Sequence, residues 1–388
     1  MTLPAGLQAA VAARYDRYLD DLAGLVGIDC GSYTPVGVNH VADAVAEALR
    51  ELGAAVERIH HQPADGERQL GDLVIGRLEG SGPRLLLIGH MDTVFELGTA
   101  AERPFRVDGE RATGPGVSDM KGGLLAGLHA LAALQGLDRR PSVTFVANPD
   151  EEIGSPFSTP HIRSLAGEHD AALVLECARA NGDIVSARKG IADLEVTITG
   201  RAAHAGVEPE KGRSAILEAA HQVLALHALN GRWPSVTVNA GVIEGGTRPN
   251  VVAASCRLEL DLRAASTAEF DAAAAEIREI VAHPTLDGVS TELRRAAFHQ
   301  PMERTVGNGR LADLAIAIAA ELGIELRDAL TGGASDANTT TGEGLPTLDG
   351  LGPIGGDDHS ADEWLDLSSV VPRTTLLAAL IDRIAEAI

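Results

Sequence analysis

The sequence predicts an α/β protein of two domains. The first has a mostly parallel mixed sheet flanked by helices, and a smaller α+β domain is inserted into it. The chain has 388 residues, which is more than one hydrophobic core usually holds. Several continuous apolar runs, typical of buried parallel strands, end in polar residues. After about residue 190 the runs alternate between polar and apolar residues, as in an antiparallel sheet with one solvated face.

Helices and strands alternate through the first part of the chain. Apolar residues recur at helical spacing over 6–26 and 37–53, and Gly53 ends the second of these runs. Glycines and a proline crowd the loop at 114–123, which leads into an apolar helix. We expect strands at 54–59, 72–78, 84–88, 141–147 and 170–175, and further helices at 124–134, 307–322 and 367–387.

Several of these strands end in side chains that can bind metal or move protons. Ligands of open α/β sheets bind at the carboxyl ends of the strands, so we expect these side chains to converge. Adjacent carboxylates after a buried strand must face water or a cation, because an unpaired buried charge is costly. The residues at the strand ends and in the glycine-rich loop are His90, Asp92, Asp119, Glu151, Glu152 and Glu176.

Single members of this set have simpler interpretations. His90 and Asp92 also fit an exposed loop, and Asp119 also fits a turn that caps the next helix. The adjacency of Glu151 and Glu152 is more informative, since one carboxylate could bind a metal while the other takes a proton from water. Mixed imidazole and carboxylate ligands favour zinc, and manganese or cobalt are alternatives because geometry more than affinity sets the choice.

The second part of the chain follows another pattern. Its order of strands and helices is β-α-β-β-α-β, the ferredoxin-like split motif. We therefore assign 190–299 to an inserted domain, and 1–189 and 300–388 to the first domain. The elements expected in the insert are strands at 191–199, 235–243, 251–263 and 288–295, and helices at 212–229 and 267–282.

The net charge limits the classes of partner, and the cysteine content indicates the compartment. The net charge is -23, which argues against nucleic acid or an anionic membrane surface, because both would repel the chain. Three cysteines without a CxxC pattern do not form a disulfide framework, so a reducing cytoplasm is the expected compartment. The N-terminus lacks the pattern of a signal peptide, and no apolar run is long enough to span a bilayer.

The chain also carries a series of motifs in a fixed order. They are GHMDTV at 89–94, GPGVSDMKGG at 114–123, DEEIGS at 150–155, Glu176, TGRAAHAG at 199–206, RPNVV at 248–252, DLR at 261–263, TGGASD at 331–336 and HS at 359–360. This series resembles the aminoacylase and carboxypeptidase family of di-zinc hydrolases. That family includes glutamate carboxypeptidase of the carboxypeptidase G type, acetylornithine deacetylase and succinyl-diaminopimelate desuccinylase.

The resemblance implies a role for each residue of a di-zinc centre. Asp119 would bridge two zinc ions, and its peptide bond to Met120 would be cis. Asp92 would orient His90, and Glu151 would be the general base. The ligands of one zinc would be His90, Asp119 and Glu176, and those of the other Asp119, Glu152 and His359.

The resemblance also gives the inserted domain a part in substrate closure and in forming a homodimer. His204 would reach the partner's active site and stabilise the oxyanion. Asn250 and Arg263 would bind a substrate carboxylate, for which the planar guanidinium fork is suited. Gly333 in the TGGASD motif is also expected at the substrate.

These expectations favour hydrolysis of an amide bond to a C-terminal amino acid with a free carboxylate. The substrate would be a small peptide or N-acyl-amino acid, and the closest likeness is to a glutamate carboxypeptidase. One alternative is an N-acyl-amino-acid deacylase of the acetylornithine or succinyl-diaminopimelate type. Another is a catalytically silent protein that only binds an amino acid or peptide.

Overall fold

A computed structural model describes residues 6–135 and 141–388. They form two compact units, and each is described by itself below. The first unit holds the chain up to Ser186 together with Arg304–Leu330 and Ser335–Ile388. The second holds Ala187–Glu303 and Thr331–Ala334.

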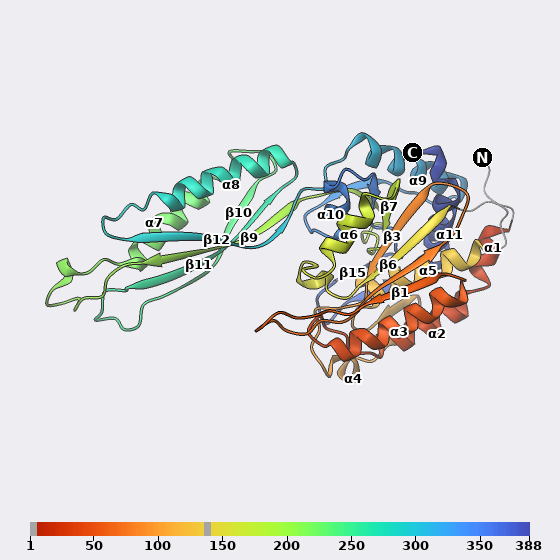
Figure 1. The fold of residues 1–388 in the computed structure, drawn as a ribbon, viewed down its shortest axis with the longest axis horizontal. Helices are drawn as coiled ribbons and strands as arrows, with labels where there is room; N and C mark the ends of the chain where they lie inside the picture. The colour runs from red at the N-terminus through yellow and green to blue at the C-terminus, as the bar shows by residue number, and fades with distance from the viewer. Residues whose placement is uncertain (1–5, 136–140) are drawn as a thin grey trace. The chain divides into compact units, whose positions relative to one another are not determined.

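A six-stranded sheet forms the centre of the first unit (Figure 1). Its order is β1-β2-β6-β3-β7-β14, with parallel pairs from β6 to β14 and antiparallel pairs from β1 to β6. The predicted mixed, mostly parallel sheet is therefore confirmed. Its strands are β1 (Ala55–Ile59), β2 (Leu73–Leu78), β3 (Arg84–His90), β6 (Ser142–Asn148), β7 (Ala171–Val174) and β14 (Thr347–Leu348).

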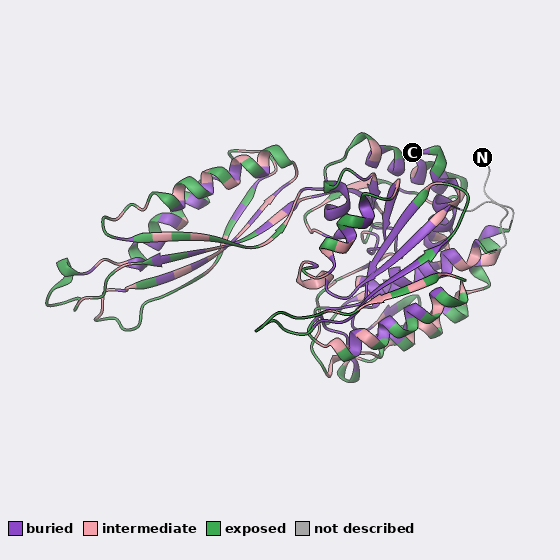
Figure 2. Cartoon of the chain, in the orientation of Figure 1, coloured by how far each residue is buried: buried purple, intermediate pink, exposed green. Residues whose placement is uncertain are grey.

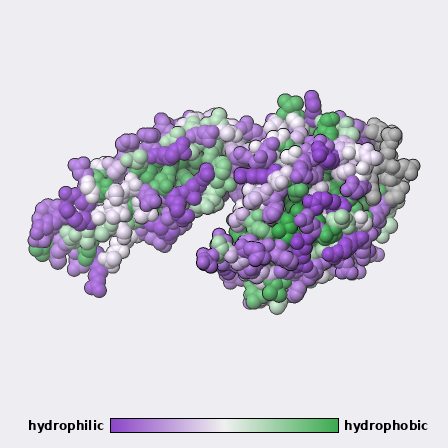
Figure 3. Space-filling view, viewed as in Figure 1, coloured by the Kyte–Doolittle hydropathy of each residue, from purple (hydrophilic) through white to green (hydrophobic). Residues whose placement is uncertain are grey.

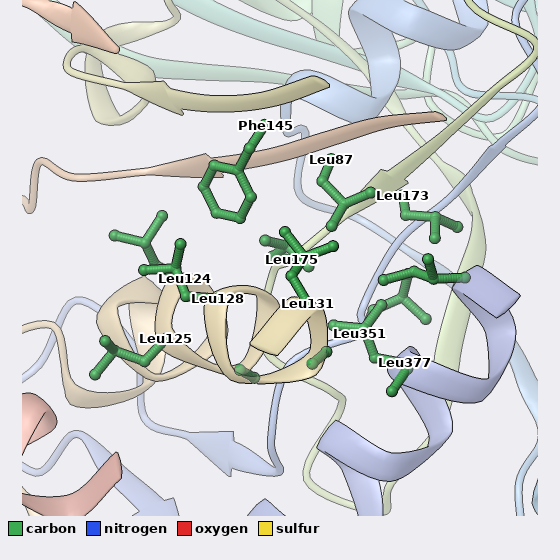
Figure 4. Packing of buried hydrophobic residues seen from close by; sticks show 14 of the residues in the cluster. Leu87, Leu124, Leu125, Leu128, Leu131, Phe145, Leu173, Leu175, Leu351 and Leu377 are labelled. Atoms are coloured by element: carbon green, nitrogen blue, oxygen red, sulfur yellow. The ribbon is translucent and has the colours of Figure 1, made fainter. Parts of the chain in front are cut away.

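Both faces of this sheet are covered, which explains the continuous apolar runs. Leu87 and Phe145 pack with Leu124 and Leu128 of α5 (Figure 4), and the neighbouring Ile88 is equally buried. Figure 2 shows the central strands buried along their length, while the outer helices are buried on one side and exposed on the other. Among the described residues of the first unit, the helices of eight or more residues are α2 (Tyr15–Val26), α3 (Pro35–Glu51), α5 (Gly123–Ala133), α6 (Thr159–Ala166), α9 (Val306–Glu321) and α11 (Val370–Arg383).

The helix predicted over 6–26 is wrong in one respect. It is broken into α1 (Leu7–Ala12) and α2, since Arg14 turns to φ −100° and ψ −1° between them. Apolar spacing does not register this break, because the buried residues on both sides keep nearly the same period. Two other short helices, α4 (Thr99–Glu102) and α10 (Asp336–Gly342), have little apolar content and were not predicted.

Short strands join distant segments of the first unit. A four-stranded sheet in the order β15-β16-β5-β4 links residues 355–366 to residues 106–113. It brings the loop of His359 to the segment that leads into the glycine-rich loop. The strands are β4 (Arg106–Asp108), β5 (Arg111–Thr113), β15 (Gly355–Gly356) and β16 (Trp364–Asp366), and a separate pair joins β8 (Ile184–Arg188) to β13 (Asp328–Thr331).

The second unit is a four-stranded antiparallel sheet with two helices, in the order β10-β11-β9-β12. Chain order and strand order together confirm the ferredoxin-like motif. Ser214 and Ser266 cap the two helices by accepting the N–H groups of Leu217 and Glu269. The elements are β9 (Gly190–Thr199), α7 (Ala215–His227), β10 (Thr237–Gly245), β11 (Ser255–Ala264), α8 (Thr267–Ala282) and β12 (Ser290–His299).

Residues 331–334 group with the second unit, although the sequence placed them in the first domain. Main-chain and side-chain hydrogen bonds account for this. Lys189 donates its N–H to Thr331 O at 3.0 Å, and Arg263 Nη1 donates to Gly332 O at 2.8 Å.

Hydrophilic residues cover much of the visible surface in Figure 3. Among residues 6–135 and 141–388, no helix combines the length and the apolar character needed to cross a bilayer.

Candidate metal centre

His90 occupies the last position of β3, where the main chain fixes its ring. Its Nδ1 lies 2.9 Å from the carbonyl oxygen of Asp92. A carbonyl can only accept, so Nδ1 carries a proton and Nε2 is the nitrogen left to face a metal ion. The Asp92 carboxylate is further away, at 3.5 Å from Nδ1. The nearer orienting group is therefore the main chain of Asp92, which the sequence did not indicate.

Asp119 lies in the loop that runs into α5. The predicted cis bond between Asp119 and Met120 is present. Glu363 accepts the main-chain N–H groups of Gly116, Ser118 and Asp119 at 2.8, 2.8 and 3.0 Å. Its side chain is buried and holds the loop in place. Sequence reasoning missed Glu363, whose only signal was an acid four residues after His359.

The Asp119 carboxylate lies between two imidazole rings. Oδ1 is 3.0 Å from His90 Nε2, and Oδ2 is 3.1 Å from His359 Nε2. Glu152 Oε2 is also 3.1 Å from His359 Nε2, and Glu176 Oε1 is 3.8 Å from His90 Nε2. One carboxylate thus faces both histidines through different oxygens, as a bridging ligand would.

The residues form two groups that share Asp119. One is His90, Asp119 and Glu176, and the other is Asp119, Glu152 and His359, each with its ligand atoms within 4.8 Å of one another. Imidazole and carboxylate donors in threes, with Asp119 common to both, suit two zinc-type ions that retain open positions.

Asp92 holds the turn that carries the paired glutamates. Its carboxylate accepts the N–H groups of Glu151 and Glu152 at 3.1 and 3.2 Å, and the hydroxyl of Ser32 at 2.6 Å. Asp92 and Ser32 are both buried. Ser32 was not predicted, because a lone serine near a helix start carries no distinctive pattern.

A second buried network supports the same turn. Asn148 donates to Asp336 Oδ2 at 2.6 Å, and Ser155 donates to Asp336 Oδ1 at 2.7 Å. Ser158 also donates to the Asp150 carboxylate. Asp336, the last residue of the TGGASD motif, therefore links the end of β6 to the turn that follows it through these hydrogen bonds.

Burial and neighbouring charges shift the pKa values of the side chains in this centre. Hydrogen bonds that His359 donates to the carboxylates of Asp119 and Glu152 raise its pKa to about 11. Burial opposes protonation of His90, but its contacts with Asp119 and Asp92 raise its pKa well above the usual value. Burial also raises the pKa of Glu151 well above the usual range, although the charge of His90 works against this. A raised pKa suits a carboxylate that takes up a proton near neutral pH.

The remaining predicted residues belong to the second unit. His204 and Asn250 are neighbours, since Ala205 donates its N–H to Asn250 O at 3.0 Å. Arg263 is already paired, with Nε at 2.9 Å from Asp261 Oδ1 and Nη2 at 3.0 Å from Asp261 Oδ2. A substrate carboxylate at Arg263 would share the guanidinium with Asp261.

Gly333 belongs to the same unit. Its carbonyl oxygen accepts from Arg188 Nη1 at 3.2 Å. The main chain of the TGG segment therefore packs against arginines of the second unit, while Asp336 of the same motif belongs to the first.

The fold has a mixed sheet flanked by helices, and two groups of imidazole and carboxylate ligands share Asp119 at the ends of its strands. This combination is that of a metallohydrolase. Residues 86–383 match Peptidase family M20/M25/M40, and the chain belongs to this family.

The relatives include a carboxypeptidase and a desuccinylase, so their names point to two different kinds of substrate. The chain is 33% identical to carboxypeptidase G2 of Pseudomonas sp. over 93% of its own length and 87% of the relative's. It is 28% identical to succinyl-diaminopimelate desuccinylase of Methylobacterium radiotolerans, over 92% and 94% of the two chains. Among solved structures, aminopeptidase PepT of Bacillus cereus aligns with a TM-score of 0.78 at 23% identity, over 96% of this chain and 99% of that one. This last likeness concerns the fold alone.

Proposed function

We propose that this metallohydrolase uses two zinc ions to cleave an amide bond to a C-terminal amino acid bearing a free carboxylate, as a glutamate carboxypeptidase does. The observation that carries the proposal is the pair of ligand groups sharing Asp119, with Glu151 directly before the ligand Glu152. Manganese or cobalt are alternatives, since the same donors bind them.

Glu151 acts as general base and then general acid. It takes a proton from the attacking water and delivers it to the leaving amine. Bound ions would polarise the carbonyl and lower the pKa of water. Asp92 keeps the main chain of Glu151 fixed, and Asp119, which lies between His90 and His359, would be the ligand common to both ions.

Similarity to carboxypeptidase G2 over nearly the whole chain supports the carboxypeptidase-type substrate. Similarity to succinyl-diaminopimelate desuccinylase favours the deacylase as a second candidate. Both reactions hydrolyse an amide with the same catalytic residues, so they differ in what binds around the centre.

Under the same proposal, the second unit binds the carboxylate of the substrate and forms the contact between the two chains of a dimer. Arg263, Asn250 and Gly333 would bind the carboxylate, and His204 would act on the partner's oxyanion. The helix α7 and the edge strand β10 support a homodimer, because they expose large apolar side chains. These are Ile216, Leu217, Leu224 and Ile243, which are 42%, 50%, 71% and 55% exposed.

A metal analysis and a substrate panel test this proposal. Zinc content should approach two ions per chain, and N-acylated glutamates should be hydrolysed faster than acetylornithine or succinyl-diaminopimelate. The reverse order of rates would favour the deacylase. A Glu151→Gln variant should keep its metal and lose about 10²- to 10⁴-fold in kcat. If this variant retained normal turnover with its metal bound, Glu151 would not be the base.

A further inference from the structure

A cavity of about 420 Å³ lies between α2, α3 and α5 of the first unit (Figure 1). Its volume is within the range of small-molecule sites. None of the described residues that line it belongs to the two ligand groups of the metal centre. On α5 the lining extends to Ala132, nine residues after Gly123 and thus about 14 Å along the helix. We call this space the helix cavity.

The buried part of the lining is mostly apolar. It includes the side chains of Leu25, Val45, Leu125 and Leu128. Small residues from all three helices leave the space open, and these are Gly24, Ala44, Ala48 and Ala132. Moving an apolar group from water onto such a surface is favourable. This part of the helix cavity therefore suits an apolar side chain.

The exposed part of the lining is charged, and one of its cations has no partner. Arg17 Nη2 donates to Glu51 Oε2 at 2.8 Å, so these two charges are paired. The guanidinium of Arg14 forms no hydrogen bond or ion pair with the part of the chain that the structure describes. Burial and the charge of Arg17 lower the pKa of Arg14. A carboxylate bound beside Arg14 would pair with it and offset this repulsion.

The same lining carries acids that favour a positive group. Asp20 and Glu47 are exposed and form no ion pair within residues 6–135 and 141–388. Asp21 lies 3.1 Å from His129 Nε2, and its side chain is 38% exposed. These acids would repel a ligand that carried only a carboxylate, whereas a ligand that carried only an ammonium group would leave Arg14 unpaired. The charges therefore suit a zwitterion.

Two buried polar atoms of the lining point to the same kind of ligand. Arg14 Nε and His129 Nδ1 have no hydrogen-bond partner among the described residues, although buried polar groups are normally paired. The Asp21 carboxylate accepts from His129 Nε2, and burial lowers the pKa of His129, so Nδ1 is an acceptor. An acceptor beside Arg14 and a donor beside His129 would complete the hydrogen bonding of this lining.

We propose that the helix cavity binds a free amino acid with an apolar side chain. The carboxylate of the ligand pairs with Arg14, and its ammonium group lies toward Asp21 and His129. Its side chain packs against the leucines of α2 and α5. This site is separate from the metal centre, and the proposal does not depend on the proposed function, because it concerns binding and not hydrolysis.

Isothermal titration of the zinc-loaded protein tests the class of ligand. L-leucine should bind at one site per chain outside the metal centre. Glycine should bind about 10- to 100-fold more weakly, because it has no side chain to bury. Isocaproate lacks the ammonium group of leucine and isoamylamine lacks its carboxylate, and each should bind at least about tenfold more weakly than leucine. If either bound as tightly as leucine, the ligand would not be a zwitterion and the proposal would fail.

Two substitutions test the position of the site. Arg14→Met should weaken leucine binding by about 10- to 100-fold, since it removes the charged donor. Ala44→Phe, at an exposed lining position, should weaken it by filling the helix cavity. Arg50→Met is the matched control, because Arg50 is an exposed arginine of α3 outside the lining, and it should bind leucine as the wild type does. Unchanged thermal unfolding and zinc content would show that the variants are folded.

A free amino acid could also bind at the metal centre as a product, and Arg263→Met separates the two sites. Leucine binding that Arg14→Met weakens and Arg263→Met leaves intact supports the helix cavity. Binding that only Arg263→Met weakens would place the ligand at the metal centre and overturn the proposal. Absence of leucine binding to the wild type at millimolar concentration would overturn it as well.

Discussion

The carboxylate of Asp92 accepts the main-chain N–H of Glu151 at 3.1 Å, with the Glu152 N–H at 3.2 Å. An Asp92→Asn variant keeps one acceptor oxygen and places an amide NH₂ against one of these donors. We expect kcat or metal affinity to fall by about 10- to 100-fold. Steady-state kinetics and metal analysis measure both effects. Ser32→Ala, which removes a single donor to the same carboxylate, should have a smaller effect. Full activity of Asp92→Asn would show that the turn of Glu151 and Glu152 keeps its conformation without the Asp92 carboxylate.

Metal affinity should increase with pH. Hydrogen bonds that His359 donates to the carboxylates of Asp119 and Glu152 raise its pKa to about 11, and carboxylate contacts outweigh burial to raise the pKa of His90. Both rings are therefore protonated in the metal-free chain at neutral pH, and each must release its proton to bind an ion. Affinity should rise by up to about tenfold per pH unit for each proton released. Zinc competition titrations between pH 6 and 8 measure the slope, and a flat profile would contradict these proton positions.

Glu363 should matter to the centre although it is not among the ligands. Glu363→Gln leaves one oxygen for the three N–H groups that the carboxylate accepts. The loop of Asp119 should loosen, and we expect metal affinity to fall by about 10- to 100-fold. Isothermal titration of the metal-free variant measures this. Asp362→Asn, an exposed neighbouring acid, is the control. Equal affinities in Glu363→Gln and the wild type would rule out the positioning role.

Gly123 allows α5 to approach the strand end that carries Glu176. A Cβ at this position would lie 1.8 Å from the carbonyl oxygen of Leu175, which cannot be accommodated without moving the helix. Gly123→Ala should lower the free energy of unfolding by about 1–3 kcal/mol and weaken metal binding. Gly24→Ala in α2 is the matched control, because nothing lies within 4 Å of its added Cβ. Removing a glycine from a helix there should be neutral or stabilise by about 0.5–1 kcal/mol. Chemical denaturation distinguishes the two, and similar stabilities would contradict the predicted clash.

Much of the fold follows from local patterns in the sequence. Both faces of β3 and β6 are covered, so their apolar runs are continuous and their ends are easy to find. The second unit is solvated on one face, and β11 accordingly alternates between buried and half-buried residues. The break at Arg14 and the short helix α10 lack such patterns, because neither changes the apolar period.

The candidate site was predictable only in part. His90 and Glu152 stand at the ends of apolar runs, so their place at the carboxyl ends of strands could be predicted from the sequence. The role of His359 was predicted through the resemblance alone. Glu363 acts through main-chain N–H groups 244 to 247 residues away, and such contacts leave no spacing to recognise. The pairing of Arg263 with Asp261 is different: residues two apart on a strand share a face, so this contact could have been inferred.

The small sheet that joins residues 106–113 to residues 355–366 has a consequence for synthesis on the ribosome. His359 and Glu363 are made 240 and 244 residues after Asp119, which they contact. Until then β5 lacks its partner β16, and the Asp119 loop lacks the carboxylate that holds it. The nascent chain can assemble β3, β6 and β7 earlier, but it would offer an ion only half a binding site until the segment of His359 and Glu363 has been made.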